Sequence, residues 1–202
     1  MRVLVACEFS GIVRDAFKAR GHDAWSCDLQ PTERPGNHIQ GDVLKIIDNG
    51  WDLMIAHPPC QFLSFAGNAW FNESKYGDRA RERKKNREIA FQFFMSLVNA
   101  PIERICVENP MGYPNSHYRK PDQIINPFQF GDAERKRTCL WLKNLPCLTP
   151  VNEVPPPEPL YYTGSSGHAR YFTDGFSPSP NRQNDRSRTF QGIANAMKSQ
   201  WG

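Results

Sequence analysis

The feature that most constrains the fold is the alternation of short apolar runs with helical stretches over the first hundred residues. Residues 2–7, 22–27, 51–56 and 102–107 form short runs rich in aliphatic side chains, as buried parallel strands do. Helical patterns lie between them at residues 12–19 and 81–98, with a short helical turn at 43–47. This order predicts an α/β fold with a mostly parallel sheet and helices on both faces.

The long helical pattern at residues 81–98 predicts which side chains face the core. Ile89, Phe93 and Leu97 recur at helical spacing and should form the buried stripe. The basic side chains between residues 79 and 87 should stay in solvent. This basic cluster either contacts phosphate groups or is simply solvated, and the sequence allows both interpretations.

Composition excludes several classes of protein. A chain of 202 residues with 39% hydrophobic residues can form a core without disulfides. No window approaches the roughly 18 apolar residues of a membrane span, and the first apolar run is too short for a signal peptide, so we expect a cytoplasmic protein. The six cysteines lack CxxC spacing, so we expect reduced thiols and no metal site. The net charge of +4 permits a polyanionic partner without requiring one.

The second half of the chain is richer in proline. Residues 138–142 still predict a strand, but residues 146–180 combine many prolines with Gly and Ser, which predicts a loop or small irregular lobe. After residue 188 the pattern is helical again, with Phe190, Ile193, Ala194 and Met197 at suitable spacing. We therefore expect a single domain over residues 1–202.

A cysteine stands directly after one predicted strand, in the string His57-Pro58-Pro59-Cys60. Two prolines stiffen a loop at the sheet edge, where a thiol can be exposed and reactive. A small buried hydrophobe is the alternative reading of Cys60. Amino-group methyltransferases carry a related Pro-Pro motif that ends in an aromatic residue, which stacks on the flipped base. Cysteine cannot stack, so that chemistry is disfavoured.

Two more strings place polar side chains at strand ends. Glu108 ends the strand at 102–107, and Arg135 and Arg137 enter the strand at 138–142. A thiolate can add to an electron-poor ring carbon while a carboxyl group relieves charge on a ring nitrogen. Two arginines at positions i and i+2 of a strand point to the same face, where their guanidinium groups can hydrogen-bond to a phosphate or a base oxygen. A solvated glutamate and a solvated basic edge are the alternatives.

In this order, the motifs resemble those of the DNA cytosine-5 methyltransferase family over nearly the full length. Pro58-Pro59-Cys60-Gln61 resembles the family's nucleophile loop, and Glu108-Asn109 resembles its Glu-Asn-Val signature with Pro110 in place of Val. The resemblance assigns catalysis to Cys60, Glu108, Arg135 and Arg137; cofactor binding to Phe9, Ser10, Gly11, Ile12, Asp28, Leu29, Asp42, Val43, Pro58 and Asn195; and substrate binding to Gln61, Ser64 and Asn109.

The resemblance implies a Rossmann-like class I methyltransferase that uses S-adenosyl-L-methionine. Cys60 would attack C6 of a cytosine in DNA and Glu108 would engage N3. The methyl group would then pass to C5. In a duplex the base would have to leave the stack. The helix over 189–202 would return to the cofactor site, and a monomer is expected.

Three departures from the family pattern stand out. Val13 replaces a loop glycine, Ala133 replaces a glutamine, and residues 146–188 replace a large recognition domain. This reduction predicts a short or relaxed target, as a phage or bacterial modifier, including one from a restriction–modification system, would use. RNA, a free nucleotide, or a catalytically silent DNA- or partner-binding paralogue are the alternatives. Five side chains are candidates for reading bases: Tyr161, Tyr162, His168, Arg170 and Tyr171.

Overall fold

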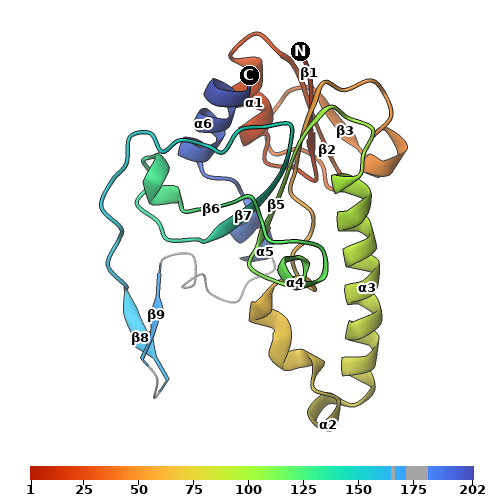
Figure 1. Ribbon diagram of the computed structural model, residues 1–202, viewed down its shortest axis with the longest axis vertical. Helices are drawn as coiled ribbons and strands as arrows, with labels where there is room; N and C mark the ends of the chain where they lie inside the picture. The colour runs from red at the N-terminus through yellow and green to blue at the C-terminus, as the bar shows by residue number, and fades with distance from the viewer. Residues whose placement is uncertain (165–166, 172–181) are drawn as a thin grey trace.

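A seven-stranded sheet forms the centre of the computed structural model, which describes residues 1–164, 167–171 and 182–202 (Figure 1). Four of the strands lie where the apolar runs predict them, and β7 lies where the later run does. The strands are β1 (Arg2–Ala6), β2 (Asp23–Asp28), β3 (His38–Gln40), β4 (Leu53–Ala56), β5 (Arg104–Pro110), β6 (Gln123–Ile125) and β7 (Thr138–Lys143).

The strand order is β3-β2-β1-β4-β5-β7-β6. Neighbours from β3 to β5 are parallel, whereas β7 runs antiparallel to both β5 and β6. The first five strands follow the doubly wound Rossmann order, which reverses between β1 and β4. In such sheets ligands bind outside the carboxyl ends of the strands at this reversal. The prediction of a mostly parallel α/β sheet is confirmed.

Helices cover both faces of the sheet (Figure 1). On one face α1 (Ile12–Lys18) and α6 (Gln191–Trp201) pack together over Val3 and Val5. On the other, α3 (Asp78–Val98) and the 3-10 turn η1 (Val43–Lys45) pack over Leu4 and Ala6. Because successive strand side chains point to opposite faces, one apolar run supplies both cores.

The predicted buried stripe of α3 is wrong in detail. Ile89 is 68% exposed, whereas Phe94 and Leu97 are fully buried. Phe94 meets the buried ring of Trp141 edge to face, with 5.1 Å between centroids. Of the adjacent Phe93 and Phe94, only Phe94 packs edge to face against Trp141 on β7. Because β7 is distant in sequence, helical periodicity alone does not predict which of the two phenylalanines is fully buried.

Several short elements escape the sequence patterns. The proline-rich segment holds a hairpin of β8 (Tyr161–Thr163) and β9 (His168–Arg170), which stands away from the main body in Figure 1, followed by α5 (Arg182–Ser187). The side chain of His168 lies outside the described residues. The remaining elements are η2 (Phe65–Phe71), α2 (Glu73–Tyr76), α4 (Pro114–His117) and η3 (Pro127–Phe130).

Within the described part of the chain, no helix is long and apolar enough to cross a membrane. All six cysteines are free thiols. Among the same residues, no group of three or more His, Cys, Asp or Glu side chains is placed to hold a metal ion.

Candidate functional site

The ends of β4 and β5 bring Cys60 and Glu108 to the same edge of the sheet. The two strands are parallel neighbours, with Ala56 opposite Val107. Cys60 follows β4 after a short loop, while Glu108 is part of β5. Glu108 acts electrostatically on the Cys60 thiol. The thiol and carboxyl that the sequence predicts as a pair are therefore neighbours.

Asn109 ties the two strand ends together. Its side chain is buried, and its Nδ2 donates to the carbonyl oxygen of Pro58 at 3.0 Å. This bond holds the loop that carries Cys60 against β5. Asn109 Oδ1 is also buried and has no hydrogen-bond partner among the described residues. The predicted substrate contact thus has a visible positioning role, and one polar atom that remains unsatisfied.

The loop after Cys60 is clamped to the segment after β5. The amides of Leu63 and Ser64 donate to the Cys60 carbonyl oxygen at 3.1 and 2.9 Å. The Tyr113 amide donates to the Leu63 carbonyl at 2.7 Å. A methyl group on Gly112 would overlap that same carbonyl, so only glycine permits this close approach. Ser64 Oγ accepts from the Ala66 amide at 3.2 Å and caps η2.

Arginines of α3 bind the carbonyl oxygens of this loop instead of remaining in solvent. Arg83 Nη2 donates to the Gln61 carbonyl at 2.8 Å, and Arg87 Nε donates to the Phe62 carbonyl at 2.9 Å. The Arg87 guanidinium also lies 3.4 Å from the Phe71 ring centroid. The prediction that the whole basic cluster stays in solvent is wrong for these two, because the loop and its rings lie directly over them.

The Cys60 thiol is accessible yet closely surrounded. The residue as a whole is exposed, but protein atoms enclose much of the space around its sulfur, and this desolvation is the largest cause of a raised thiol pKa. The negative charge of Glu108 raises the pKa further, while Lys136 and Arg186 oppose it. The resting thiol is therefore predominantly protonated at neutral pH.

Glu108 makes a contact that the sequence motifs do not foretell. His57 Nδ1 lies 2.8 Å from Glu108 Oε2, and the side chains are 8% and 16% exposed. Burial alone would raise the pKa of Glu108. The hydrogen bond and charge of His57, together with Lys136, outweigh it and lower the pKa. Glu108 is thus held as a carboxylate against a histidine. A histidine that directly precedes the Pro-Pro-Cys string was the available signal.

Lys136 faces the carboxylate from the loop before β7. The strand begins at Thr138, so Arg135 and Arg137 lie outside it and the expected strand geometry is wrong for them. Both arginines are exposed, and Arg135 Nη1 bonds the Tyr171 hydroxyl at 2.8 Å. Lys136 points the other way, toward Glu108, and its Nζ donates to the Arg186 carbonyl at 2.8 Å.

The loop after β1 is packed and already engages the start of α1. Phe9 and Ser10 are 7% and 3% exposed, and Ile12 is half-buried. The buried Glu8 carboxylate accepts the amides of Val13 at 2.7 Å and Arg14 at 3.2 Å. A carboxylate of the chain itself therefore satisfies the free N–H groups of this helix start.

The structure explains why residue 11 is a glycine. Its φ of 73° favours glycine, and a Cβ there would collide with the guanidinium of Arg14. Arg14 is fully buried, donates to Ser26 Oγ and Thr32 Oγ1 at 3.2 Å, and also contacts Gly36. The space that this glycine opens is thus filled by an arginine that fixes the loop after β2.

Acidic residues gather at the ends of β2 and β3. Asp28 is half-buried, and burial raises its pKa although its Oδ1 accepts the Gln30 amide at 2.8 Å. Asp28 and Asp42 both act electrostatically on Cys7, which directly follows β1 with a φ of 58°. Val43 is buried. Leu29 is 74% exposed. The predicted cofactor residues on these strands therefore meet at one edge.

Helix α6 returns to the sheet beside α1, and its first turn approaches Glu108. Ile193 and Met197 line a small hollow with His57 and Glu108. A methyl group on Gly192 would overlap the Phe130 carbonyl, and its amide donates to Asp132 at 2.8 Å. Asn195 is half-buried and accepts from Gln191 at 3.3 Å. Gly192 thus allows α6 to pack closely against η3.

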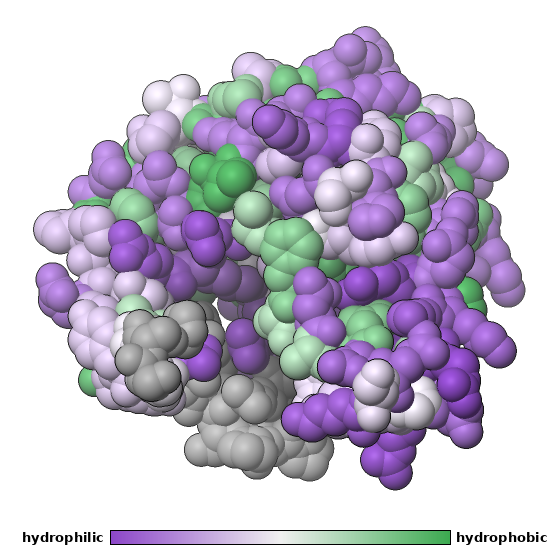
Figure 2. All heavy atoms as spheres, turned by 60° about the horizontal axis from the view of Figure 1, so that its bottom comes forward, coloured by the Kyte–Doolittle hydropathy of each residue, from purple (hydrophilic) through white to green (hydrophobic). Residues whose placement is uncertain are grey.

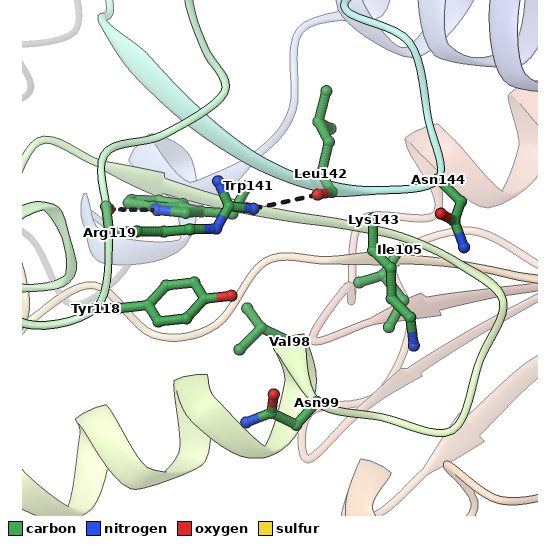
Figure 3. Close-up of a pocket in the computed structure, with 9 residues that line it drawn as sticks. All are labelled: Val98, Asn99, Ile105, Tyr118, Arg119, Trp141, Leu142, Lys143 and Asn144. Carbon is green, nitrogen blue, oxygen red and sulfur yellow. Dashed lines mark hydrogen bonds between the residues drawn. The ribbon is translucent and has the colours of Figure 1, made fainter.

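Two hollows differ in place and lining. The smaller, with room for at most about one water molecule, lies at His57, Glu108 and Lys136. The larger, of about 430 Å³, lies at the opposite edge of the sheet, between the end of α3 and the end of β7 (Figure 3). There Arg119 donates to the Leu142 carbonyl at 3.1 Å and Trp141 donates to the Arg119 carbonyl at 3.0 Å.

The end of the molecule that carries α2, β8 and β9 is mainly hydrophilic (Figure 2). Hydrophobic surface gathers in a band near the middle of this face, and the surface is hollowed beside it. Exposed aromatic side chains belong to the elements at this end: Phe65 and Trp70 on η2, and Tyr161 and Tyr162 on β8.

Comparisons with known proteins add little. No family model matches this chain, and no curated protein matches it. One solved structure, described as a proposed DNA modification methyltransferase encoded within an E. coli prophage, aligns with a TM-score of 0.46 at 15% identity. The alignment covers 82% of this chain and 58% of that one. A likeness this low carries no argument about activity, so function is argued from the residues themselves.

Proposed function

We propose that this chain is an S-adenosylmethionine-dependent methyltransferase that modifies C5 of cytosine in DNA through a covalent bond to Cys60. The observation that carries the proposal is the accessible Cys60 thiol held beside a buried carboxylate at adjacent strand ends. Packing of the sheet does not require an exposed thiol and a buried His57–Glu108 hydrogen bond at that edge. A nucleophile beside an acid–base group is what addition to a pyrimidine ring needs.

The side chains divide the chemistry among them. The Cys60 thiolate bonds to C6, and Glu108 faces the ring nitrogen N3. Asn109 and the α3 arginines keep the Cys60 loop in place through bonds to backbone carbonyls. Lys136 and Arg186 favour the thiolate electrostatically. Arg135 and Arg137, both exposed near this edge, are proposed to contact the base or its phosphate.

The proposed cofactor fits the ends of β2 and β3 better than the loop after β1. When bound, S-adenosylmethionine supplies an electrophilic methyl group. The Asp28 carboxylate would accept from the ribose hydroxyls, and the exposed Leu29 would lie against the adenine, with Asp42 and Val43 beside it. Gly11 opens space only for Arg14, so Pro58 and the ends of β1 and α6, including Asn195, would hold the methionine part.

A DNA substrate is favoured by the surface around Cys60. Arg79 and Lys85 lie on α3, the helix that binds the Cys60 loop, and their exposed side chains make no hydrogen bond or ion pair with the other described residues. Phe65 and Trp70 are 47% and 55% exposed on the neighbouring η2. Cations can bind phosphates, and exposed rings can stack on unpaired bases. The hairpin β8–β9 offers few side chains for base reading, which supports a short target sequence.

Methyl transfer to defined substrates tests the proposal. Purified protein with tritiated S-adenosylmethionine should label unmodified DNA but neither RNA nor dCMP, and a 5-fluorocytosine duplex should trap a covalent adduct on Cys60. Label on RNA or dCMP alone would replace the substrate class. Cofactor binding without any label would identify a silent DNA- or partner-binding protein.

A further inference from the structure

One buried titratable side chain at the site has no role in the function proposed above. The His57 side chain is 8% exposed, and its Nδ1 lies 2.8 Å from Glu108 Oε2. Its Nε2 is buried without a hydrogen-bond partner among the described residues. The His57 amide donates to the Ala6 carbonyl at 2.9 Å, which fixes the residue at the end of β4. The imidazole is thus held rigidly against the carboxylate.

Charged groups reach this imidazole from the segments after β1, in β5 and before β7, while α6 contributes only the apolar Ile193 and Met197. Glu8 at the end of β1 interacts with it electrostatically, and Glu108 on β5 bonds it directly. Lys136, before β7, acts on Glu108, and Cys60 lies on the same loop as His57. Two carboxyl groups and one ammonium group therefore lie around the ring.

The proposed reaction creates a need for a stored proton. N3 of neutral cytosine carries a lone pair, and a Glu108 carboxylate offers only further lone pairs, so the two do not attract each other. Glu108 is nevertheless held as a carboxylate, because its pKa is lowered despite burial. N3 becomes basic only when a thiolate adds to C6. A donor behind Glu108 would supply the proton at that moment.

Resting on the proposed function, we propose that His57 is the positioning residue that stores this proton and passes it through Glu108 to N3. The Cys60 thiol first loses its proton to solvent, and as the thiolate sulfur bonds C6, ring electrons move toward N3. The Nδ1–H bond of His57 breaks as a Glu108 O–H bond forms, and that O–H bond breaks as N3–H forms. His57 becomes neutral and Glu108 ends as it began. After the methyl group has passed to C5, the C5 proton leaves to solvent, the C6–S bond breaks, and the N3 proton returns through Glu108 to His57.

The pH dependence of methyl transfer tests this path. Asparagine can still donate to Glu108 but cannot store a proton. His57→Asn should lower kcat by about 10²-fold at neutral pH, the scale of general acid catalysis, and move the alkaline limb of the profile to lower pH. Affinity for S-adenosylmethionine should be unchanged. A kcat within about threefold of wild type with an unmoved limb would overturn the path.

A matched variant and a second measurement keep the test independent of folding. His117 is exposed on α4 and bonds Ser116 and the Tyr113 carbonyl, so His117→Asn should leave the profile unchanged. In ¹⁵N NMR, both His57 ring nitrogens should stay protonated to higher pH in wild type than in Glu108→Gln. Identical titrations would show that the pair holds no shared proton.

The two proposals fail in distinguishable ways. A wild-type protein that binds S-adenosylmethionine but labels no cytosine substrate overturns the proposed function and the catalytic use of the proton. The NMR comparison then decides the shared proton alone. Active wild type with an unmoved limb in His57→Asn overturns only the role of His57.

Discussion

The two edges of the sheet carry two hollows that differ in what their polar atoms do. At the edge with the larger hollow, Arg119, Lys143 and Asn144 all donate to backbone carbonyls of the chain. At the edge with the smaller one, His57 Nε2 and Asn109 Oδ1 are buried without partners among the described residues. Buried polar atoms left unsatisfied cost stability and persist where function uses them. Of the two hollows, the smaller one is therefore the better candidate for the chemistry, although its volume is far smaller. Elsewhere in the described residues, His22 Nε2 just before β2 is also buried without a partner.

The comparison is tested most strongly by the exposed cysteines, because one lies at each edge. Cys60→Ser should lower methyl transfer by at least about 10³-fold with cofactor affinity retained, since a hydroxyl replaces the nucleophile. Cys147→Ser, at the exposed thiol of the other edge, should leave the rate unchanged. Scintillation counting of labelled DNA measures both. A Cys60→Ser rate within about tenfold of wild type would mean that Cys60 is not the nucleophile.

Rigidity of the Cys60 loop, which belongs to the edge with the smaller hollow, gives the next prediction. Gly112→Ala places a methyl group against the Leu63 carbonyl and should cost about 1–3 kcal/mol, as overpacking does. For a chain of this size that cost lowers the Tm by roughly 2–12 °C, at about 2–4 °C per kcal/mol. Gly41→Ala, where nothing lies within 4 Å, is the matched control. Equal melting curves for the two variants would refute the clamp.

The electrostatic coupling between Cys60 and Glu108 predicts a smaller, pH-dependent effect. Burial and the Glu108 charge both raise the pKa of the thiol, so less thiolate is present at a given pH. Glu108→Gln removes the Glu108 charge and should therefore lower the pKa of the Cys60 thiol. Alkylation of Cys60 by iodoacetamide at pH 8 should then be faster. An increase of a few fold is expected, since one pKa unit corresponds to about tenfold in thiolate. Slower alkylation in the variant would reverse the assigned sign.

Sequence reasoning predicted the elements whose side chains are buried on both faces and lost accuracy where pairing is distant. The runs at β1 and β4 are nearly all apolar and β5 has the buried apolar centre Ile105–Val107, and these runs predicted the sheet. Strand-end placement predicted Cys60 and Glu108. Three-residue strands such as β3 and β6 are defined by their neighbours, which local patterns do not contain. His57 and Lys136 were missed for the same reason, since their partner Glu108 lies on another strand.

A substitution at the larger hollow should have the smallest effect on methyl transfer, in contrast to substitutions at the smaller hollow. Arg119 bonds Asp122 at 2.8 Å on a partly exposed surface, and such pairs contribute about 0–1 kcal/mol. Arg119→Met removes this pair and the hydrogen bond to the Leu142 carbonyl, which contributes about 0.5–1.5 kcal/mol. The variant should therefore shift urea unfolding by about 1–2 kcal/mol. It should leave methyl transfer unchanged, because none of the site residues depends on Arg119. If this variant instead lowers the rate tenfold at unchanged stability, the larger hollow also takes part in the reaction, and unsatisfied polar atoms do not distinguish the two hollows.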